Sequence, residues 1–121
     1  MERRRISSGT EWESQVGYSR AVRVGDTGGD RVLVSGTTAT DDDGNVCAPG
    51  EPAEQTRIAL ENVADALREA NSSLDDVVRT RLYVTDIEMW EAVGGVHGDV
   101  FGDVRPASAL IEVEALIEPG L

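Results

Sequence analysis

The amino-acid sequence predicts one α/β domain in which a mixed sheet carries two helices on one face. Residues 77–85 alternate in the manner of a strand. Residues 60–67 repeat apolar side chains at helical spacing. The chain has 121 residues, which is the length of a single domain. Strands that are separated by helices need crossover connections, so part of the sheet must be parallel.

The first half of the chain predicts a hairpin after a polar start. Residues 1–16 are polar, and we expect an irregular N-terminal extension there. Residues 20–24 and 31–36 are predicted as two strands, because a glycine-rich turn cluster at residues 25–30 separates them. A second, acidic turn at residues 41–45 precedes a short extended piece at residues 46–47.

Two helices are predicted in the second half. The first opens at residues 49–52, because proline suits the first turn of a helix, and it ends at residues 71–73. Its buried face consists of Leu60, Val63, Ala64 and Leu67. The second helix shares one apolar face among Trp90, Val93, His97 and Phe101.

The strands of the second half span residues 77–85 and 107–116. The first strand directs one set of side chains toward the helices, namely Val78, Thr80, Leu82 and Val84. The opposite face holds Val77, Arg79, Arg81 and Tyr83, and nothing in the chain is left to cover it. An uncovered sheet face in so short a chain favours oligomerisation.

The charge balance argues against nucleic acid and membrane partners. The chain has 23 acidic and 11 basic residues and a net charge of −12, and the basic residues are all arginine. This charge repels phosphates and acidic lipid surfaces. Two interpretations stay open, an ordinary acidic cytosolic protein and a surface adapted to a high-salt cytoplasm, where ions screen the self-repulsion. The absence of lysine favours the second.

No cofactor, metal ion or membrane segment is expected. Cys47 is the only cysteine, which excludes an intrachain disulfide and a zinc site built on cysteine pairs. The acidic turn at residues 41–45 lacks the glutamate spacing of a calcium loop. Polar residues follow the basic start, so no signal peptide is expected. No stretch reaches the about 20 apolar residues that span a bilayer, and we expect a cytoplasmic protein.

A series of short motifs resembles the RidA/YjgF family. Residues 17–22 are similar to the family's "PYSQAV", residues 34–37 to "VSGQ", and residues 55–62 to "EQTRQALEN". Residues 73–80 are similar to "SLDDVVKT", residues 83–86 to "VYLKD", and residues 106–113 to "PARTTVEV". The resemblance covers residues 17–117 and rests on the order and spacing of the motifs together.

The resemblance implies a chorismate-mutase-like fold over residues 17–121 and a homotrimer. In such trimers the sheets join into a central barrel, and three pockets lie between subunits. Active members hydrolyse reactive 2-imino acids to 2-keto acids and ammonia. An arginine holds the substrate carboxylate, because its planar fork matches a carboxylate with two hydrogen bonds. Some relatives are described as endoribonucleases or translation inhibitors.

Three departures from the family pattern fall on this pocket. The arginine of "PART" aligns with Ser108, and Arg105 lies three residues earlier, about 10 Å along a strand and on the other face. The family's helical asparagine aligns with Gly94. The final family strand, "LVEIEA", has no counterpart before Leu121. We expect the domain to lack that strand, either as a truncated form or as a true absence.

The ligand site is predicted to contain Tyr18, Ser35, Gly36, Arg81 and Ser108. Tyr18 and Arg105 are also the candidates for catalysis, against the alternatives of a packed aromatic and a surface ion pair. Arg81 either supplies the missing anion contact or forms a salt bridge at an interface. A histidine suits acid–base chemistry near neutral pH, but the apolar helix face around His97 favours a packed histidine.

Two functions of different classes follow. The first is a trimeric RidA-like protein that binds a small metabolite, such as a carboxylate, between subunits and lacks conventional 2-imino acid deaminase activity. The second is an imine or enamine deaminase, or another hydrolase, with a site rebuilt around Tyr18, Arg81 and Arg105. An endoribonuclease or translation inhibitor ranks last, because the net charge of −12 opposes RNA binding.

Overall fold

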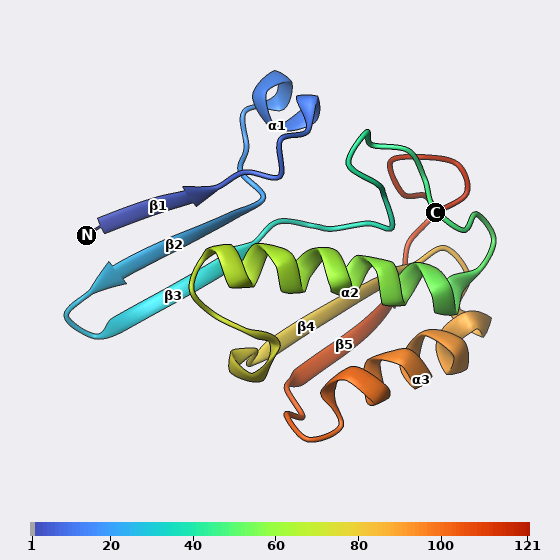
Figure 1. Ribbon diagram of the computed structural model, residues 1–121. Helices are drawn as coiled ribbons and strands as arrows, with labels where there is room; N and C mark the ends of the chain where they lie inside the picture. Colours follow the sequence, from blue (N-terminus) through green and yellow to red (C-terminus); the bar gives the residue numbers. More distant parts are fainter. Residues whose placement is uncertain (1) are drawn as a thin grey trace.

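The computed structural model describes residues 2–121, apart from the side chain of Asp26. The α/β class is confirmed (Figure 1). The elements in chain order are β1 (Glu2–Ile6), α1 (Glu11–Val16), β2 (Ala21–Asp26), β3 (Gly29–Val34), α2 (Pro52–Glu69), η1 (Leu74–Asp76), β4 (Arg79–Val84), η2 (Ile87–Met89), α3 (Trp90–Phe101) and β5 (Ala107–Glu112).

The strands divide between two sheets. β1, β2 and β3 form an antiparallel sheet, while β4 and β5 pair in parallel with Thr80 opposite Ser108. The predicted mixture of parallel and antiparallel pairing is therefore present. However, no strand pairing joins β3 to β4 within residues 2–121, so the sheet is interrupted where one continuous sheet was expected. Figure 1 shows α2 and α3 on the same side of the two sheets.

The N-terminal segment is not irregular, which corrects the sequence prediction. β1 pairs with β2 along its whole length, and Ile6 lies opposite Ala21. Both side chains are buried, and they pack in the core cluster with Ala66 of α2 and with Ala70, which caps the C-terminus of α2. The sequence hid this strand because four of its five residues are exposed and polar, so only Ile6 shows an inward face.

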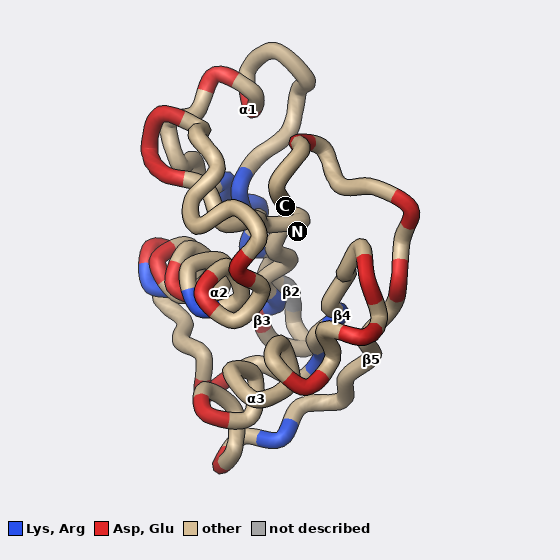
Figure 2. Tube along the Cα trace, turned by 90° about the vertical axis from the view of Figure 1, so that its right-hand side faces the viewer, with Lys and Arg blue, Asp and Glu red and all other residues tan. Residues whose placement is uncertain are grey.

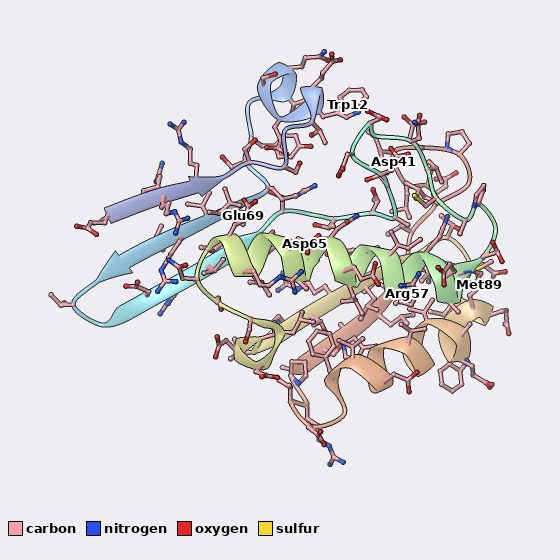
Figure 3. All side chains as sticks on the ribbon, in the orientation of Figure 1. Trp12, Asp41, Arg57, Asp65, Glu69 and Met89 are labelled. Atoms are coloured by element: carbon pink, nitrogen blue, oxygen red, sulfur yellow. The ribbon has the colours of Figure 1, made fainter. Side chains whose placement is uncertain are left out.

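Both long helices lie where the periodicity predicted them. α2 begins at Pro52, and its solvent side carries Glu61, Asp65, Arg68 and Glu69. Arg57 forms ion pairs with Glu54 and Glu61 along this helix. Figure 3 shows the labelled Arg57, Asp65 and Glu69 on α2, and Figure 2 shows acidic residues recurring along α2, α3 and the loops. None of the described helices is long and apolar enough to cross a membrane.

The alternation of β4 is confirmed over the strand itself. Thr80, Leu82 and Val84 face inward, whereas Arg79, Arg81 and Tyr83 are exposed. Val78 was predicted to face the helices, and this is wrong: it precedes the strand and is 80% exposed. On the outward face, Tyr83 and Ile111 remain 49% and 38% exposed, so this face of the β4–β5 sheet is open in the single chain.

The chain after β5 forms a loop. The strand predicted over residues 107–116 ends at Glu112, and no strand is present in residues 113–121. The loop returns to the beginning of α2, where Gln55 Nε2 donates a hydrogen bond to the Gly120 carbonyl over 2.6 Å.

Candidate functional site

Ser108 lies near the start of β5, in a line of hydrogen bonds that runs into the protein. Thr80 Oγ1 donates to Ser108 Oγ over 2.8 Å. The same Thr80 oxygen lies 2.9 Å from His97 Nε2 of α3. Ser108 is exposed, while Thr80 and His97 are half-buried. The three side chains therefore connect solvent at the β5 edge with an imidazole beneath α3.

His97 is both a packed and a hydrogen-bonded histidine. Its ring lies 4.7 Å from the Phe101 ring, centroid to centroid. Burial lowers the pKa of His97 below its ordinary value, because the interior disfavours the charged form. Burial therefore favours the neutral imidazole, which can accept a proton. The sequence predicted the packing but gave no sign of Thr80 as a partner.

A second cluster gathers three of the predicted residues around Arg20. Tyr18 follows Gly17, whose positive φ of 89° ends α1 and turns the chain toward β2. Ser35 Oγ donates to the Ser19 carbonyl over 2.6 Å. Arg20 Nη2 donates to the Gly36 carbonyl over 2.5 Å, and its guanidinium carbon lies 5.7 Å from the Tyr18 ring centroid. This distance fits a cation–π contact.

Arg20 is the functional candidate that the sequence reasoning missed. Arg20 aligns with the glutamine of the family's "PYSQAV" motif, so the sequence shows the substitution. The sequence does not show the hydrogen bond from Arg20 to Gly36. Arg20 Nε is buried and has no hydrogen-bond partner among the described residues. The Nε–H is thus a buried donor that is left unsatisfied within the described chain.

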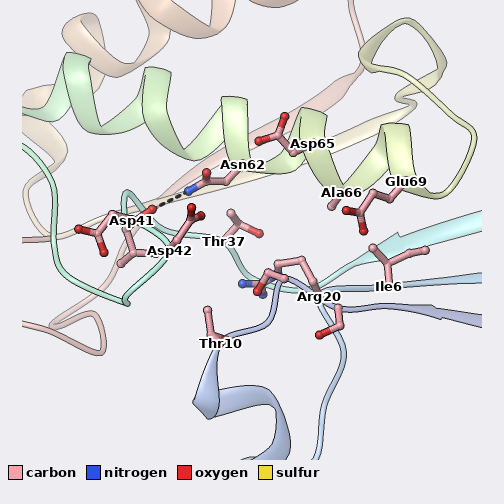
Figure 4. Close-up of a pocket in the computed structure, with 13 residues that line it drawn as sticks. Ile6, Thr10, Arg20, Thr37, Asp41, Asp42, Asn62, Asp65, Ala66 and Glu69 are labelled. Atoms are coloured by element: carbon pink, nitrogen blue, oxygen red, sulfur yellow. Dashed lines mark hydrogen bonds between the residues drawn. The ribbon is translucent and has the colours of Figure 1, made fainter.

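A polar cavity of about 190 Å³ lies between the β1–α1 segment and α2. Figure 4 shows Arg20, Thr37 and Asn62 around it, with Asp42 and Asp65 also on its wall. Carboxylates outnumber the one guanidinium in this lining, which disfavours an anion. None of the predicted ligand residues lines the cavity, so we do not assign it to the Ser108 site.

Arg81 and Arg105 do not join Ser108 within the chain. Arg81 lies on the exposed face of β4, opposite to the face that carries Thr80. Arg105 has a positive φ of 54°, and its Nε donates to the Gly102 carbonyl over 3.0 Å. The described part of the chain shows no hydrogen bond between either arginine and Ser108.

The two clusters lie at different ends of the molecule. Tyr18 and Gly36 belong to the region where β2 begins and β3 ends, near α1, whereas Ser108 lies at the start of β5 (Figure 1). One subunit by itself therefore does not bring the predicted ligand residues together. No group of His, Cys, Asp or Glu side chains in residues 2–121 is arranged to hold a metal ion.

Comparison with known proteins identifies the family. The family model described as endoribonuclease L-PSP matches residues 9–121. An uncharacterized protein of Streptomyces coelicolor is 37% identical over 115 residues, covering 95% of this chain and 82% of that protein. A RutC family protein of Pyrococcus abyssi is 32% identical over 99 residues, covering 82% of this chain and 75% of that protein. The crystal structure of Rv2704 from Mycobacterium tuberculosis, a member of the YjgF/YER057c/UK114 family, superposes with a TM-score of 0.84 at 50% identity, covering 98% of this chain and 91% of that one. This chain belongs to the RidA/YjgF family.

Proposed function

We propose that the protein is a homotrimer that binds a small metabolite in clefts between its subunits, without conventional 2-imino acid deaminase activity. The observation that carries the proposal is Ser108. The family resemblance calls for an arginine at this position to grip a substrate carboxylate. The serine hydroxyl carries no charge, and it is already engaged with Thr80. A neutral hydroxyl does not replace two charge-assisted hydrogen bonds, each of which contributes about 1.5–3 kcal/mol.

The separation of the two clusters supports a site made by two copies of the chain. Tyr18, Ser35, Gly36 and Arg20 are grouped in one region, and Ser108 is exposed in another. The open face of the β4–β5 sheet, with Tyr83 and Ile111 exposed, offers an apolar contact surface for such a copy. Ser108 lies on the other, helix-side face with Thr80, so in this arrangement the copy packs on the Tyr83 face and its ligand cluster reaches Ser108 past the free edge of β5.

Arg20 is our candidate for binding a ligand carboxylate, through the part of its guanidinium beside Tyr18 and outside the acidic cavity that it also lines. It supplies a guanidinium beside Tyr18 and Gly36. In this arrangement Arg20 holds the anionic end of the ligand, and Ser108 of a neighbouring subunit meets its other end. Arg81 and Arg105, the arginines proposed from the sequence for a rebuilt hydrolase site, form no hydrogen bond with Tyr18, Ser35, Gly36 or Ser108 in the part of the chain that the structure describes.

The proposal is tested by turnover, binding and assembly of the purified protein. 2-Iminopropionate is generated in the assay from alanine by an amino acid oxidase, and its hydrolysis is followed. We expect the wild-type protein to leave the spontaneous rate unchanged and to sediment as a trimer. Robust acceleration of hydrolysis by wild type would contradict the proposal.

Matched variants sharpen this test. Calorimetry with 2-oxobutyrate, a 2-keto acid, reports carboxylate binding. Arg20→Gln should weaken that binding at least tenfold, because it removes the charge-assisted contact. Arg68→Gln is the control, since Arg68 is exposed on α2 and pairs with Asp65. Equal weakening by both variants would remove Arg20 from the site.

A further inference from the structure

We propose that Ser108, Thr80 and His97 form a proton relay, in which His97 takes up the proton of the Ser108 hydroxyl through Thr80 and so makes Ser108 a nucleophile toward the ester group of a small ligand. This inference deepens the proposed function, because it rests on the placement of Ser108 in the ligand site. It gives Ser108 a chemical role, that of a nucleophile, in addition to its replacing the family's arginine.

The geometry has the continuity that a relay needs. The 2.8 Å between Ser108 Oγ and Thr80 Oγ1 and the 2.9 Å between Thr80 Oγ1 and His97 Nε2 are both ordinary hydrogen-bond lengths. Each hydroxyl has one proton to give and lone pairs to accept another. If Nε2 carries a proton, it donates to Thr80, and Thr80 donates to Ser108. If Nε2 carries no proton, both hydrogen bonds reverse: Ser108 donates to Thr80, and Thr80 donates to Nε2.

The surroundings keep His97 in its basic form. Burial is the sole cause of the lowered pKa of His97, so no charged side chain contributes to it. On β4, Arg79 and Arg81 lie on the opposite face. On α3, Glu91 and Asp99 are exposed, and on α2 Arg57 is engaged with Glu54 and Glu61. Burial thus favours the neutral imidazole that the relay needs as its base.

The Ser108 end of the relay is open to solvent. Gly94 lies three residues before His97, so the two positions share a face of α3. A Cβ atom at Gly94 would meet nothing within 4 Å. β5 pairs only with β4 among the described strands, so Ser108 lies on a free edge that a ligand can approach.

The proposed step balances without a cofactor. Ser108 Oγ attacks the carbonyl carbon of an ester, and a new C–O bond forms. The ester C–O bond breaks, and the leaving oxygen departs with the bonding electron pair. The Ser108 proton moves to Thr80 Oγ1 while the Thr80 proton moves to His97 Nε2. The products are an acyl-serine, the released oxyanion and an imidazolium.

The experiment uses p-nitrophenyl acetate as the probe on the full chain. The chain has no lysine, so lysine acetylation cannot obscure the result, and a Cys47→Ala background removes the only thiol. Release of p-nitrophenolate is followed against pH, and the modified residue is located by mass spectrometry. We expect acetyl on Ser108, with a rate that rises as His97 loses its proton and levels off above the pKa of His97.

Variants separate the relay from mere packing. General-base assistance contributes about 10²–10⁴-fold, so Thr80→Val and His97→Gln should each slow Ser108 acetylation at least tenfold and abolish its pH dependence. Thr80→Ser keeps the bridging hydroxyl and should preserve the rate. Ser14→Ala is the control, because Ser14 is an exposed hydroxyl bonded only to the Glu11 carbonyl in the described structure.

Two results would overturn the relay. One is acetylation of Ser108 no faster than that of Ser14. The other is an undiminished Ser108 rate in Thr80→Val, provided that sedimentation shows the variant assembled like wild type. Failure of the relay with intact trimers and 2-oxobutyrate binding would leave the proposed function standing. Loss of trimers and of binding in wild type would instead remove the proposed function.

Discussion

Asn62 holds the loop that follows β3 against α2, and its replacement gives a sharp test of the structure. Its side-chain Nδ2 donates to the Thr38 carbonyl over 3.2 Å and to the Thr40 carbonyl over 3.0 Å. The same loop contains Gly36, whose carbonyl accepts a hydrogen bond from Arg20. Asn62→Ala removes both hydrogen bonds, so it should destabilise the fold and loosen the Gly36 region together.

The expected loss follows from the two bonds. Each contributes about 1 kcal/mol net, and the two carbonyls lose a partner in a half-buried setting, so the free energy of unfolding should fall by about 2 kcal/mol. With a urea m-value of about 2 kcal/mol/M, the unfolding midpoint should move down by about 1 M. Protein concentration is held fixed, because assembly also stabilises the folded state.

Two further variants check the cause. Asn62→Asp keeps the shape but turns a carboxylate toward two carbonyl oxygens, and it should cost more than Asn62→Ala at pH 7. Asn45→Ala is the matched control, since the side-chain Nδ2 of Asn45 makes only a 3.5 Å contact with Asp41 in an exposed turn. A midpoint shift for Asn62→Ala that is no larger than that of Asn45→Ala would refute the reasoning.

Three other outcomes are expected. Burial raises the pKa of Glu13, but hydrogen bonds from Ser8, Ser7 and Thr10 outweigh it and hold the pKa below its ordinary 4.5. Glu13→Gln should therefore lower the free energy of unfolding at pH 7. The difference from wild type should vanish as the pH falls through the pKa of Glu13 in the folded protein, and urea unfolding at pH 7 and below that pKa would show this. Ile111→Asp places a charge on the open β4–β5 face and should give monomers in sedimentation velocity; retained trimers would exclude this face as the interface. In a gel shift with structured and single-stranded RNA, we expect no complex at 0.15 M or higher salt, because the net charge is −12.

The elements that the sequence predicted are those whose signals are local. Pro52 and the apolar repeat specify α2 without reference to the rest of the chain. The alternation of Thr80, Leu82 and Val84 likewise specifies β4. β1 escaped prediction because its evidence is its pairing with β2, and Arg3, Arg4 and Arg5 give no inward pattern. The interruption between β3 and β4 is also a matter of long-range pairing.

The same distinction governs the candidate site. Tyr18, Ser35 and Gly36 were predicted from motifs, and the structure groups them. Arg20 was visible as a substitution, yet its role depends on a hydrogen bond to a residue 16 positions away. The hydrogen bonds among Ser108, Thr80 and His97 join side chains from β5, β4 and α3. No spacing within one segment could reveal that these three side chains meet.

The serine at position 108 changes the character of the site as well as its strength. An arginine carries its charge at every physiological pH, and it binds a carboxylate in any protonation state of its neighbours. A hydroxyl carries no charge, and the direction in which it donates depends on the atom behind it. The Ser108 hydroxyl is hydrogen-bonded to Thr80, which in turn contacts the titratable His97.

In our proposals, Arg20 holds the anionic end of the ligand, and the relay of Ser108, Thr80 and His97 moves a proton at the other end. Binding and proton transfer then belong to different side chains, so Arg20→Gln should weaken 2-oxobutyrate binding while leaving Ser108 acetylation intact, and Thr80→Val should do the reverse.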